Sequence, residues 1–190
     1  MIVTILSEPR SGSTNLAKWF WKDKNFTVLF EPFNYDMRNT IYYKFGESPK
    51  LWKYDTKHLL VKEIYDKFHP QTNELIEISD KIIVLYREDT TTQLESWENA
   101  YLTGNWDKAW LYTKPNNLPT DIIAGFYDIK TNLKENLIDS GKYFTISYEE
   151  LYYKDGFQRI VDYIDLPEVE NIDFPTGRKY RIDTTINKLI

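Results

Sequence analysis

The stretch at residues 7–14, Ser-Glu-Pro-Arg-Ser-Gly-Ser-Thr, constrains the fold of this chain more than any other. It follows an apolar, β-branched run at residues 2–6 that predicts a strand, and it precedes residues 15–22, whose apolar side chains recur at helical spacing. A turn from a strand into a helix exposes backbone N–H groups at the helix N-terminus, and these groups attract anions. The stretch therefore predicts an α/β unit with an anion-binding loop.

The residue types in this loop suit a phosphate or a sulfate group. Gly12 has no Cβ, so its backbone can approach a ligand closely. Arg10 adds a fixed positive charge with a planar fork of donors. Ser11, Ser13 and Thr14 add hydroxyl donors. A polar turn with a serine cap is the alternative interpretation of the same residues.

The nucleotide P-loop pattern, G-x-x-x-x-G-K-[ST], fits this loop poorly. Ser7 stands where the pattern has its first glycine, and Ser13 stands where it has its lysine. A P-loop nucleotide kinase or NTPase is therefore the second candidate function, and it predicts Mg²⁺ dependence and affinity for ATP.

The rest of the chain alternates between runs of strand character and helical patterns. Further strands are predicted at residues 26–30, 59–64, 81–86 and 143–148, with helices at 73–79, from Thr90, from Pro119 to Gly141, and at 157–164. This alternation predicts an α/β three-layer sandwich with a mainly parallel sheet of about five strands and right-handed crossovers.

The helix that begins near residue 90 carries two further signals. Thr90 and Gln93 have the spacing of a capping box. Leu94, Trp97 and Tyr101 recur at i, i+3 and i+7, which predicts that they form the buried face of this helix.

Polar residues follow several of the predicted strands directly. Glu31 ends the second strand, Lys62 and Glu63 lie near the end of the third, and Arg87 follows the fourth. In open α/β sheets, ligands bind at the carboxyl ends of the strands. We therefore expect these side chains to gather with the loop at one edge of the sheet.

Composition restricts the class of protein. A length of 190 residues predicts a single domain over residues 1–190. The net charge of −5 argues against general binding to nucleic acid or to anionic membranes. The absence of cysteine excludes disulfides and thiolate ligands, and no apolar run reaches the length of a membrane span. These features predict a cytoplasmic protein, whose two histidines, His58 and His69, are structural or exposed.

Two segments lack clean periodicity. Residues 33–57 contain many aromatic side chains, and they predict either an acceptor-binding insertion or an irregular segment packed on the core. The C-terminal tail, residues 168–190, contains a basic run at 178–181 that is expected to be solvated.

The hexapeptide Pro-Arg-Ser-Gly-Ser-Thr at residues 9–14 resembles the 5′-phosphosulfate-binding loop of sulfotransferases that use 3′-phosphoadenosine 5′-phosphosulfate (PAPS). In that family, an arginine at a strand end and a serine eight or nine residues later hold the 3′-phosphate, and Arg87 and Ser96 match this spacing. Together with Asp89, Gln93 and Trp97, the pair is most similar to the bacterial trehalose-type branch.

Two more segments carry the resemblance. Leu-Phe-Glu-Pro-Phe at residues 29–33 is similar to the "FEP" segment of carbohydrate sulfotransferases, where the glutamate is the proposed base. Ser-Tyr-Glu-Glu-Leu at residues 147–151 resembles the "YEDL" segment of the family, which implies that Tyr148 lies near the adenine.

The chain also departs from the family. Asn15 stands where the cytosolic branch has a tryptophan that stacks on adenine, and Glu63 stands near the place of its histidine. The trehalose-type branch has its base near Asn34, which cannot accept a proton. The cytosolic R-K-G segment has only a loose counterpart in residues 177–179. Glu31 is therefore the first choice for the base, with a pKa raised by burial, and Glu63 is the second.

The resemblance implies transfer of a sulfuryl group from PAPS to an acceptor hydroxyl, without a metal and with 3′,5′-ADP as product. Ser13 and Thr14 would bind the 5′-phosphate, while Arg10 and Lys62 would stabilise the developing charge. The expected partner is a small-molecule or carbohydrate acceptor. A non-catalytic, nucleotide-binding member of the fold is a further alternative.

Overall fold

The computed structural model describes residues 1–34, 44, 46–104, 106 and 119–165, and it contains one five-stranded parallel sheet. The strand order is β2-β3-β1-β4-β5. The strands are β1 (Ile2–Ser7), β2 (Phe26–Phe30), β3 (His58–Ile64), β4 (Lys81–Tyr86) and β5 (Phe144–Ser147). All five agree with the predicted segments to within one residue at each end.

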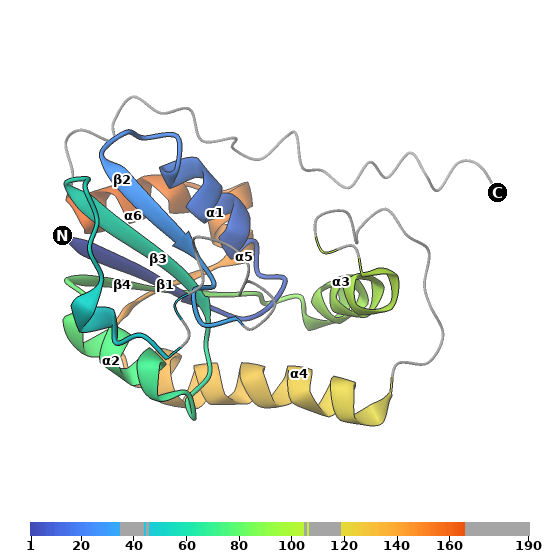
Figure 1. The fold of residues 1–190 in the computed structure, drawn as a ribbon. Helices are drawn as coiled ribbons and strands as arrows, with labels where there is room; N and C mark the ends of the chain where they lie inside the picture. Colours follow the sequence, from blue (N-terminus) through green and yellow to red (C-terminus); the bar gives the residue numbers. More distant parts are fainter. Residues whose placement is uncertain (35–43, 45, 105, 107–118, 166–190) are drawn as a thin grey trace.

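Helices cover both faces of this sheet (Figure 1). The helices are α1 (Ser13–Phe20), α2 (Pro70–Ile78), α3 (Thr90–Thr103), α4 (Thr120–Leu133), α5 (Tyr148–Tyr153) and α6 (Gly156–Ile164), with the 3₁₀ turn η2 (Pro49–Leu51) and the π-helical turn η4 (Lys134–Ile138). In Figure 1, α1, α5 and α6 lie on one side, α2 and α4 lie on the other, and α3 lies beyond the carboxyl ends of the strands. The predicted three-layer α/β sandwich is confirmed.

The core consists of apolar clusters on the two faces. On one face, Val3 and Ile5 of β1 pack with Leu16 and Phe20 of α1 and with Ile160 of α6. The opposite face holds two clusters, which are built around Leu133 beneath β4 and around Leu75 of α2 beneath β3. Strands with both faces buried read as continuous apolar runs, and this property made them recognisable in the sequence.

The register brings the strand ends together. Ser7 at the end of β1 lies beside Ile64 of β3 and Leu85 of β4, and Phe30 of β2 lies beside Lys62. The central β1 lies between β3 and β4. The two strands that follow β1 in the sequence, β2 and β3, lie on one side of it, and β4 and β5 lie on the other. The loop after β1 therefore occupies the switch point, where open α/β sheets bind ligands.

Two predictions for α3 were wrong. The helix is capped by Asp89, whose side chain accepts from the Thr92 N–H at 3.1 Å, so Thr90 is not the N-cap. Tyr101 is 45% exposed, and the buried residues of the helix are Gln93, Asn99 and Ala100. Gln93 is buried because its amide donates to the Glu8 carboxylate and to the Pro9 carbonyl, and accepts from Lys130.

The structure also adds an element that we did not predict. Helix α5 starts directly after β5 with a true capping box, in which Ser147 accepts from the Glu150 N–H and the Glu150 carboxylate accepts from the Ser147 N–H. It carries Tyr148 and Tyr152.

Several predictions fall outside the described residues. These concern residues 35–43 and 45 of the segment at 33–57, and the tail at 168–190 with its basic run. Within the described residues, none of the helices has the length and apolar character needed to cross a membrane.

Candidate functional site

The loop between β1 and α1 has a left-handed backbone at two positions. Gly12, the N-cap of α1, has φ 82°, and Arg10 has φ 60°. A Cβ on Gly12 would lie 2.7 Å from Cε2 of Tyr152 and 2.9 Å from Cδ2 of Tyr148. The Tyr152 hydroxyl donates to the Gly12 carbonyl at 2.9 Å. Both the backbone angle and the packing of α5 on the loop therefore require glycine.

The serine hydroxyls of the loop bond to one another and to the loop backbone. Ser7 donates to Ser13 Oγ at 2.8 Å, and Ser11 donates to a carbonyl of the same loop at 2.8 Å. Because Ser13 accepts from Ser7, its own hydrogen is available for a different acceptor. Thr14 and Asn15 follow in the first turn of α1, where they are half-buried and exposed, respectively.

Arg10 extends from the loop to α3. Its Nε donates to Ser96 Oγ at 2.9 Å, and its Nη1 donates to the Trp106 carbonyl at 2.6 Å. Two predicted site residues that lie 86 positions apart are thus in direct contact. The spacing in the sequence pairs Ser96 with Arg87, but here the Arg87 guanidinium donates to Thr92 Oγ1 at 2.7 Å.

Arg87 lies over the ring of Tyr148, with the guanidinium carbon 4.6 Å from the ring centroid. Its Nη1 donates to the Arg10 carbonyl at 3.5 Å. Burial raises the pKa of Tyr148 to about 12, so the phenol stays neutral at physiological pH. Since the same tyrosine ring contacts Gly12, the loop backbone and Arg87 meet on one aromatic side chain.

A buried carboxylate, Glu8, connects these parts. Its Oε2 accepts from the Arg87 N–H at 3.1 Å, from Gln93 Nε2 at 2.8 Å and from Lys130 Nζ at 2.9 Å. Lys130 also donates to the Arg87 carbonyl at 3.0 Å. Neither Glu8 nor Lys130 was predicted from the sequence. The sequence did contain one signal. Glu8 is an acidic residue inside a loop predicted to bind anions, and its negative charge therefore requires a cationic partner, here Lys130.

A second group lies at the ends of β2 and β3, where Lys62 pairs with Glu31. Lys62 is only 1% exposed, and its ammonium donates to Glu31 Oε1. Asn34 Nδ2 donates to Glu31 Oε2 at 2.7 Å. Burial opposes ionisation of Glu31, but the Lys62 ammonium and these donors together hold its pKa below its ordinary value. The expectation that burial raises the pKa of Glu31 was wrong, because the Lys62 ammonium favours the ionised carboxylate by more than burial opposes it.

Glu63 has the opposite electrostatic environment. It is 5% exposed, and its two carboxyl oxygens accept from the N–H groups of Phe33 at 3.1 Å and Ile64 at 2.9 Å. Burial, followed by the negative charge of Glu31, raises the pKa of Glu63 to about 8. Two neighbouring carboxylates thus titrate in different pH ranges, an arrangement typical of acid–base sites.

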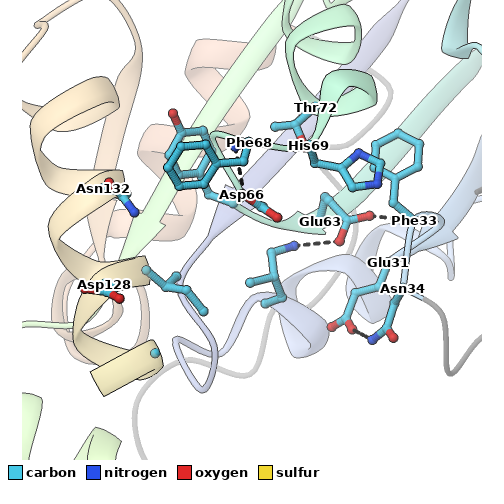
Figure 2. Close-up of a pocket in the computed structure, with 14 residues that line it drawn as sticks. Glu31, Phe33, Asn34, Glu63, Asp66, Phe68, His69, Thr72, Asp128 and Asn132 are labelled. Atoms are coloured by element: carbon cyan, nitrogen blue, oxygen red, sulfur yellow. Dashed lines mark hydrogen bonds between the residues drawn. The ribbon is translucent and has the colours of Figure 1, made fainter. Parts of the chain in front are cut away.

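A cavity of about 500 Å³ opens beside these carboxylates (Figure 2). The strand ends, the segment leading into α2 and the helix α4 form its walls. The described residues that line it are Glu31, Phe33, Asn34, Glu63, Ile64, Tyr65, Asp66, Phe68, His69, Thr72, Gly125, Asp128, Ile129 and Asn132.

The two histidines have different surroundings. His69 lines the cavity and stacks on Phe33, with ring centroids 5.1 Å apart, whereas His58 packs on Phe26 at the opposite end of β3. In the part of the chain that the structure describes, we find no group of three or more His, Cys, Asp or Glu side chains that could hold a metal ion.

Comparison with known proteins gives a fold and no family. No protein-family model and no curated protein matches the chain. Among solved structures, the chain is similar to the crystal structure of mouse sulfotransferase SULT7A1 complexed with PAP, with a TM-score of 0.50 and 14% sequence identity. The match covers 91% of this chain and 59% of the mouse chain, so this chain spans about three fifths of its neighbour's length. The chain has the α/β fold of the sulfotransferases, which is P-loop-like.

Proposed function

We propose that this chain is a sulfotransferase that transfers a sulfuryl group from PAPS to an acceptor hydroxyl. The observation that carries this proposal is the meeting of the loop backbone at Gly12 and the Arg87 guanidinium on the Tyr148 ring. The two parts that resemble the ends of a PAPS site therefore adjoin each other. The fold shared with a PAP-bound sulfotransferase supports the same function.

We assign the nucleotide contacts as follows. The N–H groups at the start of α1 and the hydroxyls of Ser13 and Thr14 bind the 5′-phosphosulfate, because a helix N-terminus favours an anion. Arg87 binds the 3′-phosphate through its planar fork of donors. Ser96 orients Arg10 by accepting a hydrogen bond from its guanidinium. Tyr148 lies beside the adenine.

Glu63 is the better candidate for the general base. A base functions best when its pKa lies near the working pH, and the pKa of Glu63 is raised to about 8. Glu31 is held as an ionised partner of Lys62, which lowers its basicity. We therefore reverse the order of preference that the sequence suggested.

The proposed step is an in-line displacement at sulfur. The acceptor oxygen forms a bond to sulfur while its proton passes to the Glu63 carboxylate. The bond between sulfur and the bridging oxygen breaks, and its electron pair stays on the 5′-phosphate of 3′,5′-ADP. Arg10 stabilises the charge that develops on the bridging oxygen. Lys62, whose ammonium interacts electrostatically with Glu63, adds positive charge on that side of the site.

The cavity is the proposed acceptor site, and a carbohydrate is the proposed acceptor. Sugar rings combine apolar faces with many hydroxyl donors. The cavity offers the Phe33 and Phe68 rings together with the carboxyl and amide groups of Glu63, Asp66 and Asn132.

Calorimetric titration with 3′,5′-ADP tests the nucleotide site. We expect binding by the wild type and a loss of at least about tenfold in Arg87→Ala, since a charge-assisted phosphate contact is removed. Arg159→Ala is the matched control, because it removes an arginine of α6 whose guanidinium bonds to Glu150 and which we do not assign to the nucleotide site. Binding that ignores Arg87→Ala, or tighter binding of Mg²⁺-ATP, would contradict the assignment.

Turnover of PAPS tests the base. Glu63→Gln should retain 3′,5′-ADP affinity and lose about a hundredfold in rate, the typical contribution of a general base. A variant with the wild-type rate would place the base elsewhere.

A further inference from the structure

The loop between β1 and α1 contains a buried carboxylate of its own. Glu8 precedes Pro9 and Arg10 in this loop and is 3% exposed. Its backbone carbonyl accepts from Ser11 Oγ at 2.8 Å, so Glu8 belongs to the turn that leads into α1. Like charges repel more strongly inside a protein than in water. A Glu8 carboxylate without a counter-charge would therefore oppose the binding of an anion at this loop.

Lys130 supplies the counter-charge from a distant part of the sequence. It belongs to α4, which lies on the opposite side of the sheet from α1 (Figure 1). Its ammonium lies 2.9 Å from Glu8 Oε2, and its side chain is 16% exposed. Because the pair is largely buried, salt in the solvent screens it little. The pair as a whole carries no net charge beside the loop.

The Lys130 ammonium has no donor left for a ligand. An ammonium group has three N–H donors. One donates to Glu8, and the other two bonds go to Gln93 Oε1 at 2.8 Å and to the Arg87 carbonyl at 3.0 Å. Lys130 therefore acts on an anion at the loop through Glu8 and not by contact.

The charge of Glu8 can be separated from its hydrogen bonds. Its Oε2 accepts from Lys130, from Gln93 Nε2 and from the Arg87 N–H. Its Oε1 makes no hydrogen bond to the residues that the structure describes. A glutamine can place its carbonyl oxygen at the Oε2 position, where it keeps these three contacts and loses the charge.

We infer that Lys130 is a positioning residue of the anion-binding loop: it neutralises Glu8, and the loop can therefore hold a phosphate or sulfate group although a carboxylate lies within it. This adds to the site a residue of α4 that touches neither the nucleotide nor the reacting atoms. The inference rests on the proposed function for the identity of the anion, whereas the Glu8–Lys130 pair does not depend on it.

Two nucleotides that differ by one phosphate test this role. 3′,5′-ADP has the 5′-phosphate that the loop would bind, and 3′-AMP lacks it. Their affinities for the full chain are measured by calorimetry at low salt. In Lys130→Met, the ratio of the 3′,5′-ADP affinity to the 3′-AMP affinity should fall at least about tenfold, because an uncompensated Glu8 repels the 5′-phosphate. Equal losses for both nucleotides would overturn the inference, since a merely distorted site weakens both alike.

Glu8→Gln keeps the test decisive even where Lys130→Met unfolds. It leaves the Lys130 charge uncompensated, so the ratio should rise at least about threefold. The double variant, Glu8→Gln with Lys130→Met, should return the ratio to within about threefold of the wild type. An unchanged or lower ratio in Glu8→Gln, or a double variant that behaves like Lys130→Met, would overturn the inference. Lys134→Met, which removes an exposed pair with Asp139, is the control and should leave the ratio unchanged.

Inorganic pyrophosphate separates this inference from the proposed function. A wild-type chain that binds pyrophosphate but not 3′,5′-ADP would contradict the sulfotransferase assignment. The inference would then require pyrophosphate binding to weaken at least about tenfold in Lys130→Met and to strengthen in Glu8→Gln. Binding of 3′,5′-ADP with the same ratio in every variant would overturn the inference and leave the assignment intact. Binding of neither ligand would overturn both.

Discussion

At the scale of single residues, the chief feature is the separation of two neighbouring carboxylates. Glu31 and Glu63 end adjacent strands, yet the pKa of the first is lowered and that of the second is raised to about 8. Burial favours the neutral form of both carboxyls, but Glu31 bonds directly to the Lys62 ammonium, whereas Glu63 accepts from backbone N–H groups and lies beside the negative charge of Glu31. Such a separation assigns different roles to chemically identical groups.

Glu63→Gln should change the pH dependence of stability. The folded protein holds a proton on Glu63 up to about pH 8, whereas the unfolded chain releases it near the ordinary carboxyl pKa of 4.5. The unfolded state therefore binds fewer protons between these values, and wild-type stability falls by roughly 1 kcal/mol per pH unit as pH rises through this window. The glutamine amide of the variant cannot ionise, so the variant lacks this contribution.

Urea denaturation at about pH 5.5 and about pH 8 measures the effect. At the lower pH the variant should be less stable by about 1 kcal/mol, because an amide nitrogen cannot accept one of the two N–H groups. At the higher pH the order should reverse. A difference that stays constant with pH would show that the raised pKa is wrong.

Gly12→Ala should destabilise the chain by about 2 kcal/mol or more. The positive φ strains alanine, and the new Cβ meets Tyr152, which cannot move freely because it is buried and bonded to the Gly12 carbonyl. Gly141→Ala is the matched control, since Gly141 has φ 64° with nothing within 4 Å of a Cβ, and it should cost about 1 kcal/mol. Equal losses in urea denaturation would contradict the close packing of α5 on the loop.

At the scale of elements, α4 does more than cover the sheet. Lys130 extends from it to the Glu8 carboxylate and to the Arg87 carbonyl. The same ammonium donates to Gln93 Oε1 at 2.8 Å. One side chain thus connects α4, the loop after β1, the end of β4 and α3. The relative positions of Arg10 and Arg87 depend on this network.

Lys130→Met should cost about 3 kcal/mol, because it leaves the Glu8 carboxylate buried without its counter-charge. Lys134→Met is the comparison, since it removes an exposed pair with Asp139 a few residues further along the chain and should cost about 0–1 kcal/mol. Chemical denaturation measures both variants. Similar small losses would mean that Glu8 finds other donors.

At the scale of the whole molecule, the apolar clusters share the same strands. β1 contributes Val3 and Ile5 to the cluster on one face and Leu6 to a cluster on the other. Neither face can lose its helices without exposing the sheet that supports the opposite face. The described part of the chain is therefore expected to behave as one folding unit.

Equilibrium unfolding should accordingly follow one transition. Tryptophan fluorescence and far-ultraviolet circular dichroism should give coincident curves in urea, because Trp19 lies in the same core as the strands. The Lys130→Met variant should shift both curves equally. Two separated transitions would show that one layer unfolds by itself, and would contradict the prediction of a single domain over residues 1–190.

The sequence predicted much of this arrangement because the signals involved are local. The strands β1 to β5 are apolar runs of the right length, and the loop at 7–14 joins one of them to a helical pattern. Their order along the chain implies a parallel sheet with polar residues at its carboxyl ends. The cap of α3 was misplaced by one residue, since Asp89 and Thr90 are both acceptable cap residues by type.

The sequence by itself determined the α/β sandwich and the set of polar residues at one sheet edge, because burial patterns and turn chemistry act over a few neighbouring residues. Only the tertiary structure decided which of these residues are partners. The contact of Arg10 with Ser96, the Lys130–Glu8 pair and the opposite pKa shifts of Glu31 and Glu63 all depend on strand register and burial. Electrostatic energies change steeply with distance and solvent exposure, and neither quantity can be read from residue spacing.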